Sequence, residues 1–215
     1  MKKPSIAKLT RQYPDRKLLE KTAPANPFRL FHHWFAEAAN AKLLDPHAMA
    51  LSTVSAGGKP TARMVLLKAL DNKGFVFFTN YLSRKGKELH QNPAACLLFF
   101  WPELGRQIRI EGRAQKVTSK ESDDYFKTRP LGSQLSAWAS HQSQVVPNRE
   151  VLEKKMRELG KKYHHRPVPR PPHWGGYRVL PSAIEFWSGR RNRLHDRLVY
   201  RRKGPGGWKR ERLSP

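Results

Sequence analysis

Residues 184–200 read Ile-Glu-Phe-Trp-Ser-Gly-Arg-Arg-Asn-Arg-Leu-His-Asp-Arg-Leu-Val-Tyr. The segment begins and ends with apolar residues typical of β-strands, and between these ends it carries four arginines, one histidine and one aspartate. This polarity is too high for a strand that is buried throughout. Guanidinium groups, an imidazole and an aromatic ring within one short hairpin are the groups that a planar, phosphorylated small molecule would require. The hairpin is therefore the first candidate for a binding site.

Further strand patterns, separated by tight turns, precede this hairpin. Apolar and β-branched residues dominate residues 48–55, 61–70, 75–80, 94–101 and 107–117, with turn residues between them. A last strand pattern follows at residues 208–213. Strands at this spacing indicate an antiparallel barrel or sandwich. We therefore predict a mainly β fold with peripheral helices.

Helical patterns flank the strands. Asn26 can cap a helix that has Pro27 in its first position, and apolar residues then recur at helical spacing before Asp45-Pro46 ends it. Further helices are predicted at residues 83–91, from a Ser119 cap to about Arg129, and at about 149–163. Residues 1–25 are basic, contain three prolines and show no periodicity, so we expect a flexible arm there. Residues 26–215 would then form a single domain.

The charge of the chain is strongly unbalanced. Lys and Arg number 42 against 17 Asp and Glu, which gives a formal net charge of +25. Such an excess attracts anions, whether nucleic acid, phosphorylated ligands or an acidic membrane surface. A nucleic-acid-binding protein is therefore one alternative. The cations are spread over all predicted elements and form no single stripe, so nucleic acid is not expected as a partner.

The cysteine content and the hydropathy of the chain indicate the cellular compartment in which we expect the protein. Cys96 is the only cysteine, so no intrachain disulfide can form, and we expect it to be an inert core residue. The longest apolar run, residues 94–101, is far too short to span a membrane. No apolar segment follows Lys2 and Lys3, so a secretory signal is not expected. These features predict a soluble, cytoplasmic protein without a membrane partner.

Several common catalytic patterns are absent. The chain has no Gly-x-Gly-x-x-Gly after a strand and no Gly-x-x-x-x-Gly-Lys-Ser/Thr loop, so the usual dinucleotide and triphosphate cradles are missing. It also lacks His-Glu-x-x-His and Gly-x-Ser-x-Gly. No metal site is predicted, and a covalent hydrolase is disfavoured.

Clusters of basic and hydroxyl residues next to strands remain. In the strand pattern 61–70, side chains alternate, so Arg63 and Lys68 are expected on opposite sides of the sheet. Ser83-Arg84-Lys85 begins a short helix, where backbone donors and two cations suit a phosphate. Gln107 lies on a strand face where it could donate a hydrogen bond to a heterocycle.

The chain carries the following motifs in order: Arg63-Met64-Val65-Leu66-Leu67-Lys68, Phe78-Thr79-Asn80, Ser83-Arg84-Lys85, Arg129-Pro130 with Ser133-Gln134, Gln142-Ser143, Trp174-Gly175-Gly176, Glu185-Phe186-Trp187 and Arg193-Leu194-His195-Asp196-Arg197. Taken together, these motifs resemble the pyridoxamine 5′-phosphate oxidase family from about residue 26 to the C-terminus, and more weakly through the arm. The last motif is highly specific when it follows the others in this order.

The resemblance implies a split β-barrel that binds FMN at two sites across a homodimer interface. It further implies oxidation of pyridoxamine and pyridoxine 5′-phosphates to pyridoxal 5′-phosphate, with oxygen as electron acceptor and hydrogen peroxide released. A flavin- or haem-binding split-barrel protein without oxidase activity is the second alternative, because related barrels bind cofactors for other purposes.

By the same resemblance, a set of polar, basic and backbone groups would bind FMN. These residues are Arg63, Met64, Val65, Leu66, Leu67, Lys68, Phe78, Thr79, Arg84, Lys85, Gln107, Gln142, Ser143, Trp187 and Arg197. The phosphorylated B6 substrate would be held by Arg11, Tyr13, Lys68, Tyr125, Arg129, Ser133, Arg193, Leu194 and His195. Of these, Arg193 and His195 are the expected catalytic residues, which orient the pyridine ring, and Asp196 is a possible orienting partner for the histidine.

The chain departs from the family pattern in three places. Relatives often have tyrosine where this chain has Phe78, which removes a hydroxyl near the flavin. His173 replaces a phenyl ring before Trp174-Gly175-Gly176, and residues 10–13 replace a more basic motif in the arm.

Overall fold

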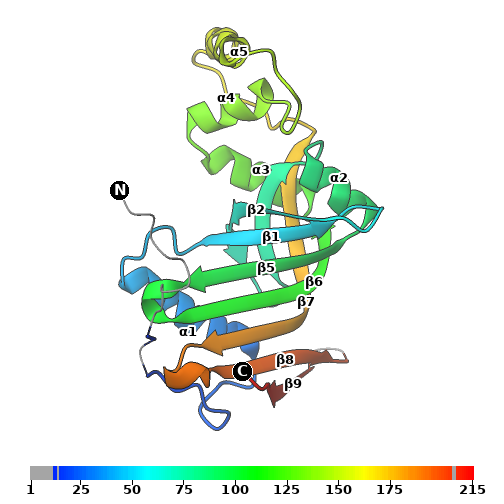
Figure 1. The fold of residues 1–215 in the computed structure, drawn as a ribbon. Helices are drawn as coiled ribbons and strands as arrows, with labels where there is room; N and C mark the ends of the chain where they lie inside the picture. Colours follow the sequence, from blue (N-terminus) through cyan, green and yellow to red (C-terminus); the bar gives the residue numbers. More distant parts are fainter. Residues whose placement is uncertain (1–11, 14, 205–206) are drawn as a thin grey trace, which may run out of the picture. The chain divides into compact units, whose positions relative to one another are not determined.

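The computed structural model describes residues 12–13, 15–204 and 207–215 (Figure 1). Its elements in chain order are α1 Pro27–Asn40, β1 Ala48–Val54, β2 Pro60–Leu66, β3 Ala69–Leu70, β4 Phe75–Asn80, α2 Arg84–Gln91, β5 Ala94–Trp101, β6 Arg106–Lys116, α3 Ser119–Thr128, α4 Leu131–Ala139, α5 Arg149–Lys162, β7 Trp174–Ser188, β8 Asp196–Lys203 and β9 Gly207–Arg212. Short 3₁₀ turns cover Pro102–Leu104 and Arg191–Arg193.

The strands form one sheet. Its order is β2-β1-β5-β6-β7-β4-β3, with β8 paired to β7 and β9 paired to β8. The pairs β3–β4, β4–β7, β7–β8 and β8–β9 are antiparallel. The prediction of a mainly antiparallel β fold with peripheral helices is confirmed.

The chain divides into two compact units. Unit 1 comprises residues Met1–Ala48, Leu97–Glu111 and Ser182–Pro215, and unit 2 comprises Met49–Cys96 and Gly112–Pro181. The long strand β7 runs through both, since its first half belongs to unit 2 and its second half to unit 1. Each unit has its own packing and its own group of predicted site residues.

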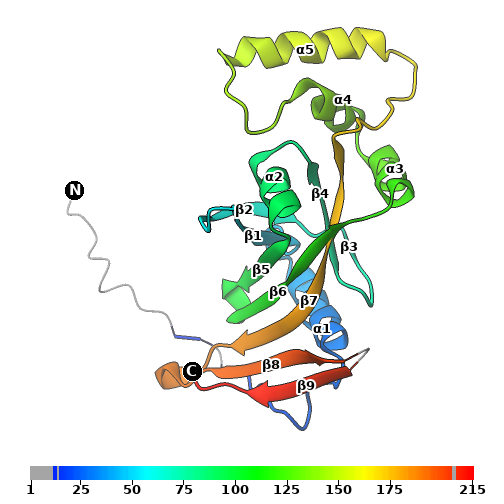
Figure 2. The same cartoon turned by 90° about the vertical axis from the view of Figure 1, so that its right-hand side faces the viewer.

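Unit 2 packs its helices over a small core. Phe126 of α3, Leu135 of α4 and Trp174 of β7 are buried together there, with residues of α5 packed against them. Figure 2 shows α4 lying alongside α5. Close backbone contact within this unit requires glycine: a Cβ on Gly176 would lie 2.7 Å from Val117 and 2.9 Å from Phe78. The Trp-Gly-Gly motif therefore lets β7 lie against its neighbours.

Unit 1 combines α1 with the C-terminal strands. The Asn26 side chain accepts a hydrogen bond from the Phe28 N–H, with Pro27 in the first turn, so the predicted helix start is confirmed. Trp34 packs edge-on against Phe186 at a centroid distance of 5.3 Å. The described part of the arm is held here as well, because the Leu18 N–H donates to Asp196 at 3.1 Å.

Several predicted boundaries differ from the structure. Helix α1 ends at Asn40, before Asp45-Pro46, and the predicted strand 61–70 is interrupted after Leu66. Helix α3 is capped by Thr118, not by Ser119, because Thr118 and Glu121 form a reciprocal capping box. Helix α4 was not predicted at all.

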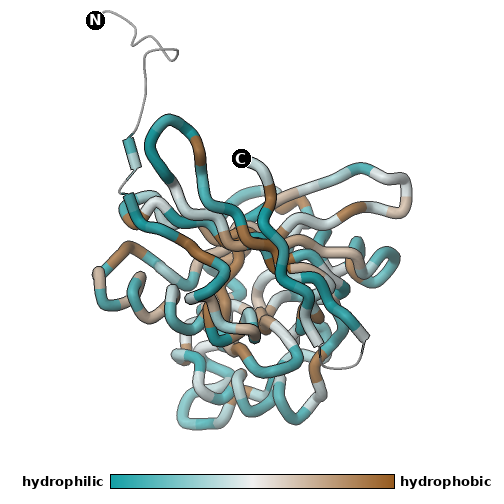
Figure 3. Tube along the Cα trace, turned by 90° about the horizontal axis from the view of Figure 1, so that it is seen from below, coloured by the Kyte–Doolittle hydropathy of each residue, from teal (hydrophilic) through white to brown (hydrophobic). Residues whose placement is uncertain are grey.

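Hydrophilic and hydrophobic residues alternate over short distances along the chain (Figure 3). Among the described residues, no helix has the length and apolar content needed to cross a bilayer.

Candidate functional site

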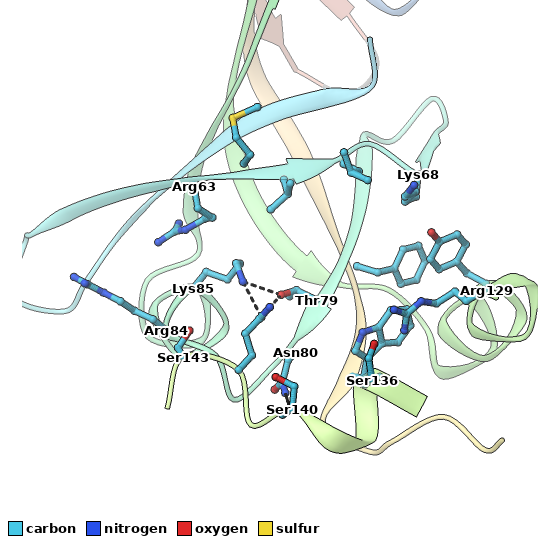
Figure 4. A pocket seen from close by; sticks show the side chains of 18 of the residues that line it. Arg63, Lys68, Thr79, Asn80, Arg84, Lys85, Arg129, Ser136, Ser140 and Ser143 are labelled. Atoms are coloured by element: carbon cyan, nitrogen blue, oxygen red, sulfur yellow. Dashed lines mark hydrogen bonds between the residues drawn. The ribbon is translucent and has the colours of Figure 1, made fainter. Parts of the chain in front are cut away.

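Unit 2 contains a pocket of about 880 Å³. This volume lies within the range of small-molecule sites, roughly 300–1,000 Å³. Strands β2 and β4, helices α2, α3 and α4, and the segment that follows α4 all contribute to its walls. Figure 4 shows two groups of cations in it, with Arg63, Arg84 and Lys85 toward one end and Lys68 and Arg129 toward the other. We call these the Lys85 end and the Arg129 end.

Lys85 is a buried cation at the first of these ends. Its ammonium donates to Gln142 Oε1 at 2.9 Å, to Thr79 Oγ1 at 3.2 Å and to Ser83 Oγ at 3.4 Å. All three acceptors are neutral. Burial, together with the charge of Arg63, lowers the pKa of Lys85 to about 8. An anion in the pocket would supply the compensating charge that these partners lack.

The start of α2 positions this ammonium. The Ser83 hydroxyl caps the helix, accepting from Gly86 N–H, and donates to the carbonyl of Asn80 at 2.6 Å. Helix α2 also lies directly on the preceding backbone, since a Cβ on Gly86 would be 2.2 Å from the Tyr81 carbonyl oxygen. A cap and a close contact therefore fix where Lys85 points.

Arg63 approaches the same end from β2. Its NH1 donates to Thr53 Oγ1 at 2.5 Å and to the Leu51 carbonyl at 3.2 Å. Its NH2 donates to Thr61 Oγ1 at 2.5 Å and to Glu88 Oε2 at 3.2 Å. The guanidinium group is therefore held rigidly by protein atoms.

The Arg129 end is aromatic as well as cationic. The Tyr125 ring stacks on Phe78 at 4.0 Å, and Phe78 stacks on Trp174 at 5.4 Å. The Arg129 guanidinium lies over the Trp174 ring, 4.5 Å from its centroid. Its buried NH1 has no hydrogen-bond partner among the described residues. A buried donor of this kind is costly unless a ligand oxygen accepts from it.

Most of the predicted residues of unit 2 line this pocket. They are Arg63, Met64, Val65, Leu66, Lys68, Phe78, Thr79, Arg84, Lys85, Tyr125, Arg129, Gln142 and Ser143. Leu67 and Ser133 do not line it. Ser143 adopts a left-handed backbone with φ of 70°, a strained conformation that is often found at functional sites. The individual roles of all these residues stay predictions.

The expected separation of Arg63 and Lys68 is wrong. Both line the same pocket. Strand β2 ends at Leu66, and Lys68 lies beyond it, where its N–H donates to the Val76 carbonyl at 2.8 Å. Alternation predicts opposite faces only while the strand continues, and here it does not.

Sequence reasoning missed five polar or aromatic residues of the lining: Thr61, Asn80, Ser136, Ser140 and Trp174. Ser136 and Ser140 are four residues apart, which is the spacing of one helix face. Recognition of α4 would have placed these two serines together, whereas Ser133 was chosen by resemblance alone.

The remaining predicted residues belong to unit 1. Trp187 of β7 pairs in register with Arg197 of β8. The rings of Trp187 and His195 are 4.6 Å apart, and Tyr13 contacts both edge-on at 5.3 and 5.8 Å. Gly189 permits this arrangement because a Cβ there would lie 2.4 Å from the Tyr13 ring. Three predicted residues thus form one aromatic cluster.

His195 has a defined tautomer. The Arg190 backbone N–H donates to its Nδ1 at 3.0 Å, so Nδ1 must carry a lone pair and the hydrogen of the neutral ring lies on Nε2. Burial, and then the charge of Arg193, lower the pKa of His195. A neutral imidazole that presents an Nε2–H donor follows from both facts.

The other residues of this hairpin are held by ion pairs or are exposed. Buried Glu185 accepts from Arg197 Nε at 2.8 Å and from Arg109 NH2 at 2.6 Å. The expected pairing of Asp196 with His195 is not found, since the Asp196 carboxylate accepts from Leu18, Arg190 and Arg212.

Arg193 has a φ of 61°, the next residue Leu194 is 70% exposed, and Gln107 is half-buried. Arg11 lies outside the described residues.

Comparison with known proteins shows which family has these sequence features. A family model described as pyridoxamine 5′-phosphate oxidase matches residues 35–163, and one described as the pyridoxine 5′-phosphate oxidase C-terminal dimerisation region matches residues 174–215. The chain is 56% identical over 211 residues to a pyridoxine/pyridoxamine 5′-phosphate oxidase of Acaryochloris marina, covering 98% of this chain and 96% of the relative. The corresponding protein of Rubrobacter xylanophilus is 55% identical over 210 residues, again covering 98% and 96%.

Two solved structures share the fold. PhzG from Burkholderia lata, in complex with tetrahydrophenazine-1-carboxylic acid, is 35% identical with a TM-score of 0.88, covering 94% of this chain and 99% of that one. An FMN-binding, pyridoxamine 5′-phosphate oxidase-related protein from Nostoc punctiforme is 17% identical with a TM-score of 0.71, covering 88% and 97%. The latter likeness confirms the predicted split-barrel class. The chain belongs to the pyridoxamine 5′-phosphate oxidase family of FMN-dependent oxidoreductases.

Proposed function

We propose that this chain oxidises pyridoxamine 5′-phosphate and pyridoxine 5′-phosphate to pyridoxal 5′-phosphate, with FMN as cofactor, oxygen as electron acceptor and hydrogen peroxide as second product. The observation that carries the proposal is the pocket of unit 2, which has cations at two separate ends. Cofactor and substrate each bring one phosphate, so a site for both needs two such ends. The names of the most similar relatives support the same reaction.

The residues at the Lys85 end fit the phosphate of FMN. Lys85 has only neutral oxygens as hydrogen-bond partners, and Arg63 and Arg84 lie at the same end of the pocket. A phosphate in this place would meet three cations and the hydroxyl of Thr79. Amide and hydroxyl groups of Gln142 and Thr79 can then fix the polar edge of the cofactor. When bound, FMN accepts the hydride that the substrate loses.

The Arg129 end would hold the phosphate of the substrate. Arg129 offers a planar fork with one unused buried nitrogen, and its stacking on Trp174 fixes the plane of that fork. Lys68 adds a second cation and Tyr125 a hydroxyl at the same end. Substrate held at a fixed distance from the cofactor reacts as in a unimolecular step.

The C-terminal hairpin would act on the pyridine ring. His195 presents an Nε2–H donor beside Trp187, and Arg193 adds a cation that repels a proton from the imidazole. In this proposal both residues orient the ring and set its protonation state. The match to a dimerisation region supports a homodimer. In this proposal FMN lies at the dimer interface, and each site takes these residues from one chain and the pocket of unit 2 from the other.

A flavin-loading experiment tests the function. The purified chain, incubated with FMN and desalted, should retain a yellow flavin spectrum. Anaerobic addition of pyridoxine 5′-phosphate should bleach it, and admission of oxygen should restore the colour with one peroxide formed per aldehyde. A chain that cannot be loaded with FMN would overturn the proposal. Stable FMN binding without bleaching would instead favour a cofactor-binding split barrel that lacks the oxidase reaction.

A further inference from the structure

Glu88 of α2 is a buried carboxylate next to the Lys85 end of the pocket. Its side chain is only 7% exposed, and it does not itself line the pocket. Oε2 accepts from Thr53 Oγ1 at 2.5 Å, from Thr61 Oγ1 at 2.7 Å and from Arg63 NH2 at 3.2 Å. Oε1 accepts from Arg84 Nε at 2.9 Å. One carboxylate therefore contacts both arginines of this end.

Two threonine hydroxyls link Arg63 to Glu88 in this network, and their oxygens lie 3.2 Å from each other. Thr53 and Thr61 each have a single hydroxyl hydrogen, and both hydrogens point to Glu88. Each hydroxyl oxygen in turn accepts from Arg63. Hydrogen bonds can therefore run from the guanidinium through the hydroxyls to the carboxylate, an arrangement that suits an ionised Glu88.

The electrostatics of the group agree with this arrangement. Burial acts to raise the pKa of Glu88, but hydrogen bonds from Thr53, Thr61 and Arg84 outweigh it and hold the pKa at about 2. The carboxylate is therefore charged at any physiological pH. Arg63, Arg84, Lys85 and Glu88 together carry a net charge of about +2, which matches a phosphate of roughly −1.5 to −2.

Arg84 depends on Glu88 for its direction. Its side chain is 61% exposed, and an exposed arginine without a partner samples many rotamers. The contact with Glu88 one helical turn later restricts this freedom and leaves the terminal nitrogens of Arg84 available at the pocket wall.

We propose that Glu88 is a positioning residue of the cofactor site, which holds the Arg63 guanidinium in place and directs the terminal nitrogens of Arg84 at the FMN phosphate. The inference rests on the proposed function, because it assumes that FMN occupies the Lys85 end. Glu88 acts through the two arginines and touches neither the isoalloxazine ring nor the substrate.

The test compares a flavin that has the phosphate with one that lacks it. Dissociation constants of FMN and riboflavin are measured by flavin fluorescence for wild type and for Glu88→Gln. The variant should lose at least about tenfold in FMN affinity, since charge-assisted contacts are weakened, and less than about threefold in riboflavin affinity. If Glu88 had a purely structural role, the substitution would weaken the binding of both flavins equally.

Glu121→Gln is the matched control. Glu121 is also a carboxylate of unit 2 that accepts from an arginine, Arg178, and its pKa is likewise held at about 2, but it does not line the pocket. This variant should leave the FMN-to-riboflavin affinity ratio unchanged. The double variant Arg84→Gln, Glu88→Gln should lose less FMN binding free energy than the sum of the losses in the two single variants, because the two residues act together.

The possible outcomes separate this inference from the function on which it rests. Wild type that binds FMN no better than riboflavin contradicts the proposed function. Wild type that prefers FMN, with the same preference in Glu88→Gln, overturns the role of Glu88. If Glu88→Gln does not fold, Thr53→Val provides the second variant, because it removes one donor to the carboxylate and keeps the side-chain shape. It should reduce FMN affinity selectively, and an unchanged ratio would again contradict the inference.

Discussion

Lys85 is the residue on which the proposed FMN phosphate site depends. It is 9% exposed, and its three hydrogen-bond acceptors are neutral oxygens. Its pKa, lowered to about 8, means that Lys85 is mostly protonated at neutral pH and loses its proton just above it. A bound phosphate would stabilise the protonated form, so binding and protonation are coupled.

FMN affinity should therefore fall as the pH rises above about 8. Lys85 loses its proton there, while the phosphate is already dianionic because its second pKa is about 6. The loss should approach about tenfold per pH unit above the lysine pKa. Fluorescence titrations at constant ionic strength between about pH 7 and about pH 9 measure it. Lys85→Arg, which stays charged, should give a flatter profile, and identical profiles would show that another group titrates.

At the scale of single residues, the sequence predicted those pocket residues that belong to contiguous motifs. Arg63 to Leu66 and Arg84-Lys85 line the pocket as the resemblance suggested. Glu88 of α2 belongs to no such motif, because its partners Thr53 and Thr61 lie on β1 and β2 and meet it only in the fold. The Arg84–Glu88 pair has the local spacing of one helical turn, but the burial of this carboxylate against two strands has no local pattern in the sequence.

Helix α2 shows how an element is held in place for the site. Its N-terminus is capped by Ser83, and Gly86 allows it to contact the backbone of Asn80 and Tyr81. The bounds of this helix, and of β4 and β5, followed from caps, turns and apolar runs in the sequence. Helix α4 did not, because Pro130 provides no side-chain cap and Gly132 weakens the local propensity. That helix is stabilised by burial of residues such as Leu135, which is a tertiary effect.

Gly86→Ala should destabilise the protein by about 1–3 kcal/mol or more and weaken FMN binding. The new Cβ would lie 2.2 Å from the Tyr81 carbonyl oxygen, so α2 would have to move and take Lys85 with it. Gly160→Ala in α5 is the control, since its Cβ would have no atom within 4 Å. Alanine there should stabilise the helix by roughly 0.5–1 kcal/mol. Urea unfolding measures both, and equal stability of the two variants would refute the argument.

At the scale of the whole molecule, the predicted site residues fall into two groups in two different units. The pocket group belongs to unit 2, and the group of Trp187, Arg193, His195 and Arg197 belongs to unit 1. The sequence indicated both groups through motifs, and the net charge of +25 indicated an anionic ligand. A sequence of one chain cannot show whether the two groups that would complete the proposed site come from the same chain, because either arrangement uses identical residues.

Mixed dimers of two inactive variants can distinguish these arrangements. Arg84→Glu damages the pocket group and Arg193→Glu the hairpin group, and both side chains are exposed enough for the variants to fold. If each site combines the pocket group of one chain with the hairpin group of the other, a mixed dimer has one site with both defects and one intact site. The purified mixed dimer should then show about half of wild-type activity, and a random mixture about a quarter.

Differently tagged chains, co-expressed and purified through both tags, provide the mixed dimer, and size-exclusion chromatography verifies its mass. Each variant alone serves as the background measurement. If both groups of a site came from one chain, every site of the mixed dimer would carry one defect, and its activity would stay at that background. Restored activity requires an intact site made by two chains, because neither parent chain contains both groups unaltered.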